Sequence, residues 1–212
     1  MVPDKHLVAF VKDPRLGRVK TRLARDIGPV AARSFYWRTT RTMLRTLHGR
    51  GRWRPWLAIA PDTAAGVRRP WPPGWLRIGQ GPGGLGDRMT RIMRHLPKGP
   101  VVIVGSDIPD IRARHIEHAF RALGDHDAVF GPSADGGYWL VGLRRCPRVP
   151  DIFRGVRWST EFALADTRAH LSSCSVALLE TLDDIDDGAD WDRWRRRQKV
   201  GGTRIESPTR DR

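Results

Sequence analysis

Two acidic segments that lie far apart in the chain could together hold a metal ion. The apolar run 101–104 reads as a buried strand, and Asp107 follows it closely. The second segment, 182–187, has the sequence Leu-Asp-Asp-Ile-Asp-Asp, and alternation along an extended backbone points Asp184 and Asp186 to the same side. Because Mg²⁺ binds one or two protein carboxylates together with phosphate oxygens, Asp107 needs only one partner from this segment.

Each acidic segment also has a simpler interpretation. Asp107 could cap a helix that starts near Ile111, and the run 182–187 could be a turn that opens a helix near Trp191. Both simple interpretations together are less favoured, because two cationic or glycine-rich loops accompany the acidic segments.

The loop after the first apolar run is rich in cations. Residues 12–23 include Lys12, Gly17, Lys20 and Arg22, and the whole chain contains only five lysines. Backbone amides in such a loop and these side chains could meet phosphate oxygens. The alternative is a solvated basic loop.

A glycine-rich segment at 79–89 precedes a predicted helix. Glycine lets a backbone approach a ligand closely, so Gly81 and Gly86 could lie against a base or ribose. Gln80 could present its amide to a base edge, and Arg88 could reach phosphates. A loose surface loop is the alternative, because a glycine-rich stretch without a fixed motif is a weak signal.

A tight turn and a hydroxyl-bearing segment could contact a second substrate. Asp135, Gly136 and Gly137 form a typical hairpin signal between two apolar runs, and Asp135 would face the same crevice as Asp107. Further along, a Trp-Ser-Thr segment precedes a predicted helix, which one hydroxyl could cap. The candidate acceptor-binding residues are Asp135, Gly136, Gly137, Tyr138, Trp158, Ser159 and Thr160.

These residues need a scaffold, and the chain predicts an α/β fold. Short apolar runs alternate with helical patterns, which is typical of βαβ units and a mostly parallel sheet. Pro29 can open a long helix with Val30, Trp37, Leu44 and Leu47 on one face. The predicted strands are 7–11, 56–60, 75–78, 101–104, 128–130, 138–143 and 176–179, and the other helices are 85–96, 111–123 and 162–171.

Length and composition are consistent with one domain. The chain has 212 residues, of which 40% are hydrophobic, enough to bury a core. We expect a domain over 1–200 and a disordered polar tail over 201–212. Two cysteines are too few to staple such a chain, and no targeting segment is evident, so a cytoplasmic location is expected.

A formal net charge of +15 attracts polyanions of several kinds. A nucleic-acid-binding protein is disfavoured because no zinc-ligand spacing, RNP-type motif or helix-turn-helix is evident. Contact with a membrane surface through the basic, tryptophan-bearing stretch 191–199 is possible in principle, although a solvated final helix is favoured.

Six motifs, in order, resemble the selenodomain-associated transferases of the GT-A-fold nucleotide-diphospho-sugar transferase superfamily. That superfamily also includes phospholactate and phosphoenolpyruvate guanylyltransferases. The motifs cover the chain from about Leu7 to Trp194. They are the basic loop ending Lys-Thr-Arg-Leu, Gln80-Gly81 with 85–89, Gly105-Ser106-Asp107-Ile108-Pro109, 135–140, 158–160 and Asp184-Ile185-Asp186.

The resemblance implies a Rossmann-like sheet with helices on both faces. It also implies Mg²⁺ or Mn²⁺ at Asp107 and Asp186, with a nucleotide donor along the N-terminal half, beside Ser106. Asp187-Gly188 stands where Thr-Pro often follows in the family, so the choice between Asp184 and Asp186 stays open.

Two reactions fit this site. In glycosyl transfer to a small-molecule acceptor, Lys20 would stabilise the leaving nucleoside diphosphate and Asp135 would be the base. In nucleotidyl transfer, a substrate phosphate or carboxylate would attack a nucleoside triphosphate and release pyrophosphate. Of these two reactions, glycosyl transfer is slightly favoured.

Overall fold

Strands and helices alternate along most of the chain. A computed structural model describes residues 4–48, 52–67, 70–146 and 148–201. In chain order the elements are β1 (His6–Lys12), α1 (Leu23–Ile27), α2 (Pro29–Leu47), β2 (Arg54–Ala60), a 3₁₀ helix η1 (Asp62–Ala64), β3 (Leu76–Gly79), α3 (Leu85–His95), β4 (Val101–Val104), α4 (Ala113–Asp125), β5 (Ala128–Pro132), β6 (Tyr138–Leu143), α5 (Ala163–Ala169), β7 (Val176–Leu178) and α6 (Gly188–Gly201).

The strands form one sheet of mostly parallel strands, in the order β3-β2-β1-β4-β6-β5-β7. Strand β6 alone runs against its neighbours, pairing antiparallel with β4 and β5. All four residues of β4 are buried, as expected for an apolar strand covered on both faces. The predicted α/β class and mostly parallel sheet are confirmed.

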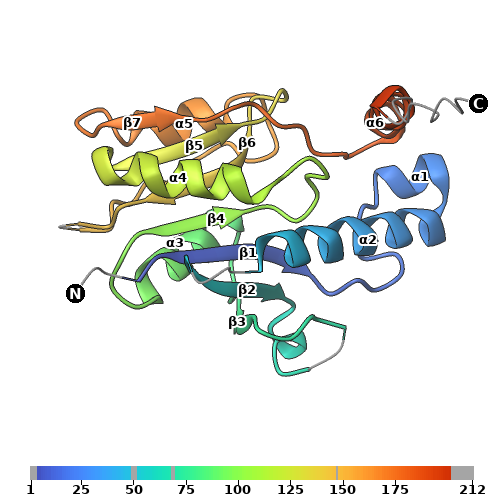
Figure 1. Ribbon diagram of the computed structural model, residues 1–212, viewed down its shortest axis with the longest axis horizontal. Helices are drawn as coiled ribbons and strands as arrows, with labels where there is room; N and C mark the ends of the chain where they lie inside the picture. The colour runs from blue at the N-terminus through green and yellow to red at the C-terminus, as the bar shows by residue number, and fades with distance from the viewer. Residues whose placement is uncertain (1–3, 49–51, 68–69, 147, 202–212) are drawn as a thin grey trace, which may run out of the picture.

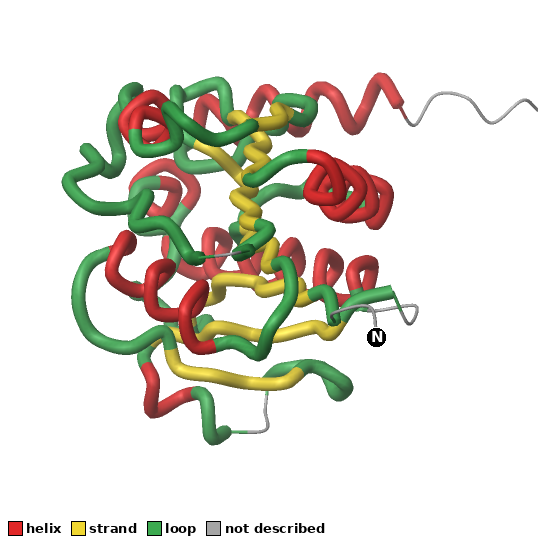
Figure 2. Tube along the Cα trace, turned by 90° about the vertical axis from the view of Figure 1, so that its left-hand side faces the viewer, coloured by secondary structure: helices red, strands yellow, loops and turns green. Residues whose placement is uncertain are grey.

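Helices cover both faces of the sheet (Figures 1 and 2). On one face, α2 and α4 pack Leu44 and Phe120 into the same apolar cluster as Leu7 of β1. On the other face, α3 and the loop after β6 pack Ile92 and Phe153 against Val8. Because β1 contributes alternate residues to the two clusters, both layers fix its position.

The buried face of α2 differs from the prediction at its first turn. Trp37 packs at the edge of the core and Leu44 and Leu47 are buried, but the side chain of Val30 is 69% exposed. The physical reason is that seven residues turn an α-helix about 20° short of two full turns. Residues spaced by seven therefore drift around the helix, and Phe35 and Met43 complete the buried face instead.

The last helix packs beside α1 and α2. Trp191 and Trp194 contact the ring of Phe35 edge-on, with ring centroids 4.9 and 5.6 Å from it. Gly201, predicted to begin the tail, is the last residue of α6, and the predicted tail over 202–212 lies outside the described residues. Among the described helices, none is both long and apolar enough to cross a membrane.

Candidate functional site

Three aspartates from two distant segments meet beyond one edge of the sheet. Asp107 lies three residues after β4, and Asp184 and Asp186 follow β7. One carboxylate oxygen from each lies within 4.8 Å of the others. The two acidic segments therefore come together as the sequence predicted, and both members of the open choice join the cluster.

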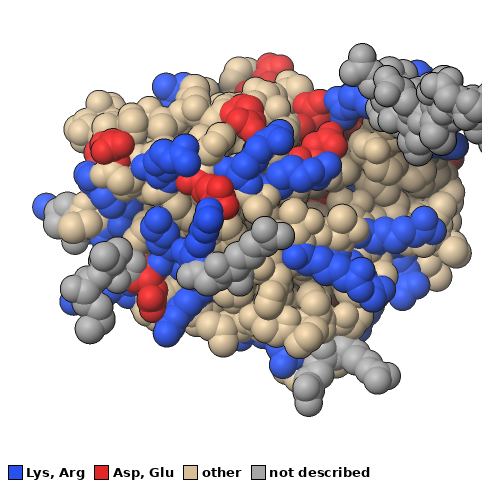
Figure 3. Space-filling model, viewed as in Figure 1, with Lys and Arg blue, Asp and Glu red and all other residues tan. Residues whose placement is uncertain are grey.

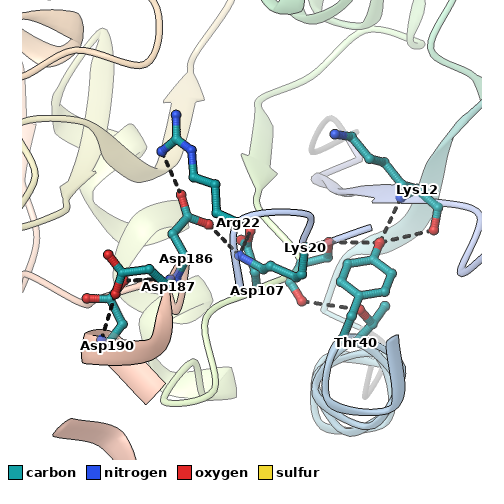
Figure 4. Close-up of polar contacts among 10 residues, drawn as sticks. Lys12, Lys20, Arg22, Thr40, Asp107, Asp186, Asp187 and Asp190 are labelled. Carbon is teal, nitrogen blue, oxygen red and sulfur yellow. Dashed lines mark hydrogen bonds and ion pairs between the residues drawn. The ribbon is translucent and has the colours of Figure 1, made fainter. Parts of the chain in front are cut away.

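Lys20 lies between two of these aspartates (Figure 4). Its Nζ donates hydrogen bonds to Asp107 Oδ2 at 2.8 Å and to Asp186 Oδ1 at 2.6 Å. Burial alone would lower the pKa of Lys20, but the two carboxylates outweigh it and hold the pKa above its usual range. The same ammonium outweighs the effect of burial on Asp107, whose pKa is lowered. The lysine side chain, only 6% exposed, is thus a charged partner of the cluster.

The backbone at Lys20 adopts a left-handed conformation with φ of 47°. That region is uncommon for residues other than glycine and costs about 1–3 kcal/mol. Pairing with two carboxylates offsets this cost and keeps the side chain directed into the cluster.

Asp184 is the aspartate of the cluster for which no ion pair is found among the described residues. Burial, together with the negative charges of Asp107 and Asp186, raises its pKa to about 7. Three carboxylates face Lys20 and, more distantly, Arg22 at 3.8 Å from Asp186, so the cluster has fewer positive than negative groups.

Replacing Asp184 with Asn should change how stability depends on pH in the metal-free protein. Between pH 4 and pH 7 the folded chain keeps a proton that the unfolded chain loses, so the free energy of unfolding falls as pH rises through this window. The asparagine side chain does not titrate, so the free energy of unfolding of the variant does not fall in this way. After allowing for solvent screening, we expect the variant to be about 1–2 kcal/mol more stable than the wild type at pH 8 and similar to it at pH 4.5.

Urea unfolding at both pH values in the presence of a chelator measures this difference. Asp183→Asn is the matched control, because Asp183 pairs with Arg197 at 3.4 Å and is absent from the cluster. An Asp184→Asn variant with the wild-type pH dependence would contradict the interpretation.

The remaining acidic residues have the structural role that the simpler interpretation gave them. Asp187 Oδ1 accepts from the amide of Asp190, and Asp190 Oδ2 accepts from the amides of Asp186 and Asp187. These bonds cap the start of α6. One short run therefore both caps a helix and supplies two aspartates to the cluster.

Beside the aspartates lies a cavity of about 490 Å³, which we call the basic pocket. Its positive charges come from the end of β1, from the loop and helix start that follow it, and from the first turn of α3. Six residues predicted to bind a nucleotide line it, namely Lys12, Lys20, Arg22, Gln80, Arg88 and Ser106.

Two residues of the basic pocket are fixed by hydrogen bonds within the protein. Gln80 is buried, and its Nε2 donates to the carbonyls of Val11 and Ala58 at 3.1 and 2.9 Å. Its Oε1 accepts from Arg88 at 3.3 Å, so the amide positions Arg88 in the pocket. Ser106 Oγ donates to the hydroxyl of Tyr36 at 3.3 Å.

Tyr36 of α2 is a pocket residue that the sequence did not reveal. Its hydroxyl accepts from the amide of Lys12 at 2.8 Å and donates to the carbonyl of the same residue at 3.0 Å. This links the end of β1 to the loop after β4. A tyrosine in a long amphipathic helix carries no local signal of such a role.

Three glycines predicted to touch the nucleotide are absent from the lining of the basic pocket. Gly17 (φ 72°) and Gly81 (φ 81°) have left-handed backbones, and the Gly81 amide donates to Asp62 at 2.9 Å. A Cβ on Gly86 would lie 2.8 Å from the carbonyl oxygen of Phe153. The left-handed backbone accounts for glycine at positions 17 and 81, and close packing accounts for glycine at position 86.

A second cavity, of about 200 Å³, adjoins the first and shares Phe10, Leu85 and Gly105 with it. We call it the aromatic pocket. Asp184 lines it, which places the acidic cluster between the two cavities. Six of the seven residues predicted to bind an acceptor line it too, namely Asp135, Gly137, Tyr138, Trp158, Ser159 and Thr160.

Gly136, the seventh predicted acceptor residue, packs behind the aromatic pocket. Its φ is 82°, and a Cβ there would lie 2.2 Å from the carbonyl oxygen of Glu161. The Gly136 carbonyl accepts from the amide of Leu164 at 3.0 Å, which docks the turn onto α5.

Gly136→Ala should therefore destabilise the protein by about 3 kcal/mol, through backbone strain plus a clash with backbone atoms. Gly17→Ala is the matched control, because Gly17 has a similar φ but a Cβ added there would meet no atom within 4 Å. We expect the control to lose only about 1 kcal/mol. Thermal unfolding measures both, and equal losses would show that the contact with Glu161 is unimportant.

Solved structures with the same fold include a candidate nucleotide-diphospho-sugar transferase and a manganese-bound protein. A structure from Desulfovibrio desulfuricans G20, named as a candidate nucleotide-diphospho-sugar transferase, has a TM-score of 0.83 and 29% identity, covering 96% of this chain and 91% of that one. The manganese complex of Rv0371C from Mycobacterium tuberculosis H37Rv has the same fold, with a TM-score of 0.55, 14% identity and coverage of 91% and 98%.

One curated relative matches by sequence over a short segment. The chain is 33% identical over 61 residues to the 2-phospho-L-lactate guanylyltransferase of Methanocaldococcus sp. (strain FS406-22). The match covers 29% of this chain and 27% of that protein, about a quarter of the relative's length.

A family model covers the centre of the chain. Its match includes the strands β2 to β6, the aspartate that follows β4 and most of the aromatic pocket. Residues 43–160, more than half of the chain, match the family described as "Uncharacterized protein conserved in bacteria (DUF2064)", and the protein belongs to that family.

Proposed function

We propose that this protein is a divalent-metal-dependent glycosyltransferase, which transfers a sugar from a nucleoside-diphosphate sugar to a small acceptor. The observation that carries the proposal is the meeting of Asp107, Asp184 and Asp186 at the junction of a basic and an aromatic pocket. The likeness to the Desulfovibrio protein supports it, and so does the resemblance of the motif order to that of the selenodomain-associated transferases.

The chemistry of the acidic cluster fits Mg²⁺ or Mn²⁺. Carboxylate oxygens are ligands that suit both ions, and three of them lie close enough to share one cation. Asp107 and Asp186 would hold the ion, with Asp184 beside them. A bound ion supplies positive charge that offsets the charge of a leaving diphosphate. The presence of manganese in the Mycobacterium structure with the same fold is consistent with this proposal.

The basic pocket has the charges that a nucleoside diphosphate needs. Lys12, Arg22 and Arg88 line it, and the Arg22 guanidinium lies 3.8 Å from Asp186. Lys20 would exchange its carboxylate partners for diphosphate oxygens once a metal-bound donor arrives. Charge-assisted hydrogen bonds to the leaving group strengthen as its charge grows, which lowers the barrier.

Asp135 is the proposed base for the acceptor. Its Oδ1 accepts from the amide of Gly137 at 2.9 Å, which fixes the carboxylate at the wall of the aromatic pocket. An acceptor hydroxyl would attack the anomeric carbon of the donor and lose its proton to Asp135. The bond from that carbon to the diphosphate oxygen would break, and its electron pair would leave with the nucleoside diphosphate.

Nucleotidyl transfer is the second candidate, favoured by the sequence match to a guanylyltransferase. In that reaction, a substrate phosphate or carboxylate would attack the α-phosphorus of a nucleoside triphosphate, and pyrophosphate would leave. The cations of the basic pocket suit a triphosphate as well as a diphosphate.

A thermal-shift screen followed by product analysis separates the candidates. Nucleotides and nucleotide sugars with Mn²⁺ are screened first, because a ligand that binds the folded state raises its melting temperature. Donors that stabilise the protein are then incubated with mixed acceptors. Release of nucleoside diphosphate supports the proposal, and pyrophosphate supports the second candidate. No Mn²⁺-dependent shift with any nucleotide would contradict both.

A further inference from the structure

The two adjoining pockets differ sharply in charge. Four cationic side chains line the basic pocket, whereas the residues described as lining the aromatic pocket include Asp135 and Asp184 but no Lys, Arg or His. The chain as a whole has 38 Lys and Arg against 23 Asp and Glu, so this lining reverses the general balance. Figure 3 shows how widely Lys and Arg are spread over one outer face.

Two basic residues adjoin this lining in sequence, and both are engaged elsewhere. Arg88, next to Met89, donates to the carbonyl of Gly83 at 2.9 Å and to Gln80 Oε1 at 3.3 Å. Arg157, next to Trp158, donates to Asp166 at 2.9 and 2.8 Å, and its guanidinium lies 4.0 Å from the centre of the Phe162 ring. Lys20 is held by Asp107 and Asp186 on the side of the basic pocket. None of these three cations lines the aromatic pocket.

Two aromatic side chains of this pocket have partners for their polar atoms. The Tyr138 hydroxyl lies 3.3 Å from Thr167 Oγ1, and the Trp139 indole donates to the carbonyl of Glu180 at 3.1 Å. The polar groups left for a ligand include carboxylate and hydroxyl oxygens, on Asp135, Asp184 and Ser159 for example, and the indole N–H of Trp158. Carboxylates accept hydrogen bonds, so they suit a ligand that donates them.

We propose that the aromatic pocket selects an uncharged, hydroxyl-bearing acceptor with an apolar face and rejects phosphorylated or carboxylated ones. This inference rests on the proposed function and names the substrate class of its acceptor site. A phosphate placed there would face the Asp135 carboxylate and meet no cationic side chain in the lining, whereas hydroxyls would donate to the carboxylate. The apolar face would lie against Phe10, Tyr138 and Trp158.

The test compares each neutral acceptor with its own phosphate monoester. Glucose and glucose 6-phosphate form one pair, and glycerol and glycerol 3-phosphate form another. Each is supplied at equal concentration with Mn²⁺ and the nucleotide sugar that gives the largest thermal shift. The readout is the mass of the glycosylated product together with the rate of nucleoside diphosphate release above hydrolysis of the donor by water.

A rate at least about tenfold higher for the neutral member, equivalent to about 1.4 kcal/mol, supports the inference. An equal or higher rate with the phosphate monoester overturns it, and so does failure of every acceptor to exceed hydrolysis. In both of those cases, a Mn²⁺-dependent rise in melting temperature with the nucleotide sugar would still support the proposed donor site. If that rise is absent, the proposed function itself is contradicted.

A charge introduced into the lining sharpens the test. Ser133→Lys adds a cation to the aromatic pocket and should shift the preference toward the phosphate monoester by about tenfold. Ser173→Lys adds the same charge at an exposed position outside the lining and should leave the preference unchanged. If both variants shift the preference equally, net charge rather than the pocket determines it, and the inference is wrong.

Discussion

Asp107→Asn is expected to abolish Mn²⁺-dependent binding of nucleotides and to lower kcat/KM at least about a thousandfold, or about 4 kcal/mol. The side chain keeps its shape but loses the charge that a metal ligand needs. Asp107 follows the central strand β4, and its carboxylate is one of three in the cluster. The thermal shift with Mn²⁺ and nucleotide measures binding, and product release measures turnover.

Asp110→Asn is the matched control for this substitution. Asp110 lies three residues further along and faces Arg197 at 3.8 Å, outside the cluster. We expect its thermal shift to match that of the wild type. Retention of the full Mn²⁺-dependent shift by Asp107→Asn would refute the assignment of the metal site.

Lys20→Met is expected to have opposite effects on metal binding and on turnover. Without the ammonium, Asp107 and Asp186 lose a partner at 2.8 and 2.6 Å, so Mn²⁺ no longer competes with it. We expect Mn²⁺ affinity without nucleotide to rise about tenfold. Turnover should fall at least about a hundredfold, because the leaving diphosphate loses a cation.

Calorimetric titration with Mn²⁺ and steady-state kinetics measure the two effects. The metal-free variant should also unfold more easily, by about 1–3 kcal/mol, since three carboxylates then face one another. Lys98→Met removes an exposed lysine elsewhere and should change neither quantity. A fall in Mn²⁺ affinity in Lys20→Met would show that the lysine supports the metal rather than replacing it.

The strands and the acidic cluster could be predicted because their signals are local. Apolar runs such as 101–104 must be buried, and the carboxyl ends of parallel strands share one edge of a sheet. That argument brings Asp107 close to the segment after β7. Alternation along an extended backbone was enough to point Asp184 and Asp186 the same way.

The partners of individual side chains could not be predicted, because they depend on packing between distant segments. Lys20 was expected to meet phosphates, and nothing near it in the sequence showed that two carboxylates hold it in the metal-free protein. Gln80 was expected to read a base, yet its amide nitrogen joins β1 to β2. Val30 was expected on the buried face of α2, but the drift of residues spaced by seven around the helix leaves it exposed.

The reversed direction of β6 separates the proposed acceptor pocket from the proposed donor site. Because β6 starts where its neighbours end, the turn at 133–137 lies at the same edge of the sheet as the acidic cluster. The chain then leaves from the opposite edge and returns with Trp158 to complete the wall. Changes in length or sequence between β6 and α5 would therefore alter the proposed acceptor pocket while leaving the proposed donor site beside β1 to β3 unchanged, so a new acceptor specificity could evolve without changes at the acidic cluster.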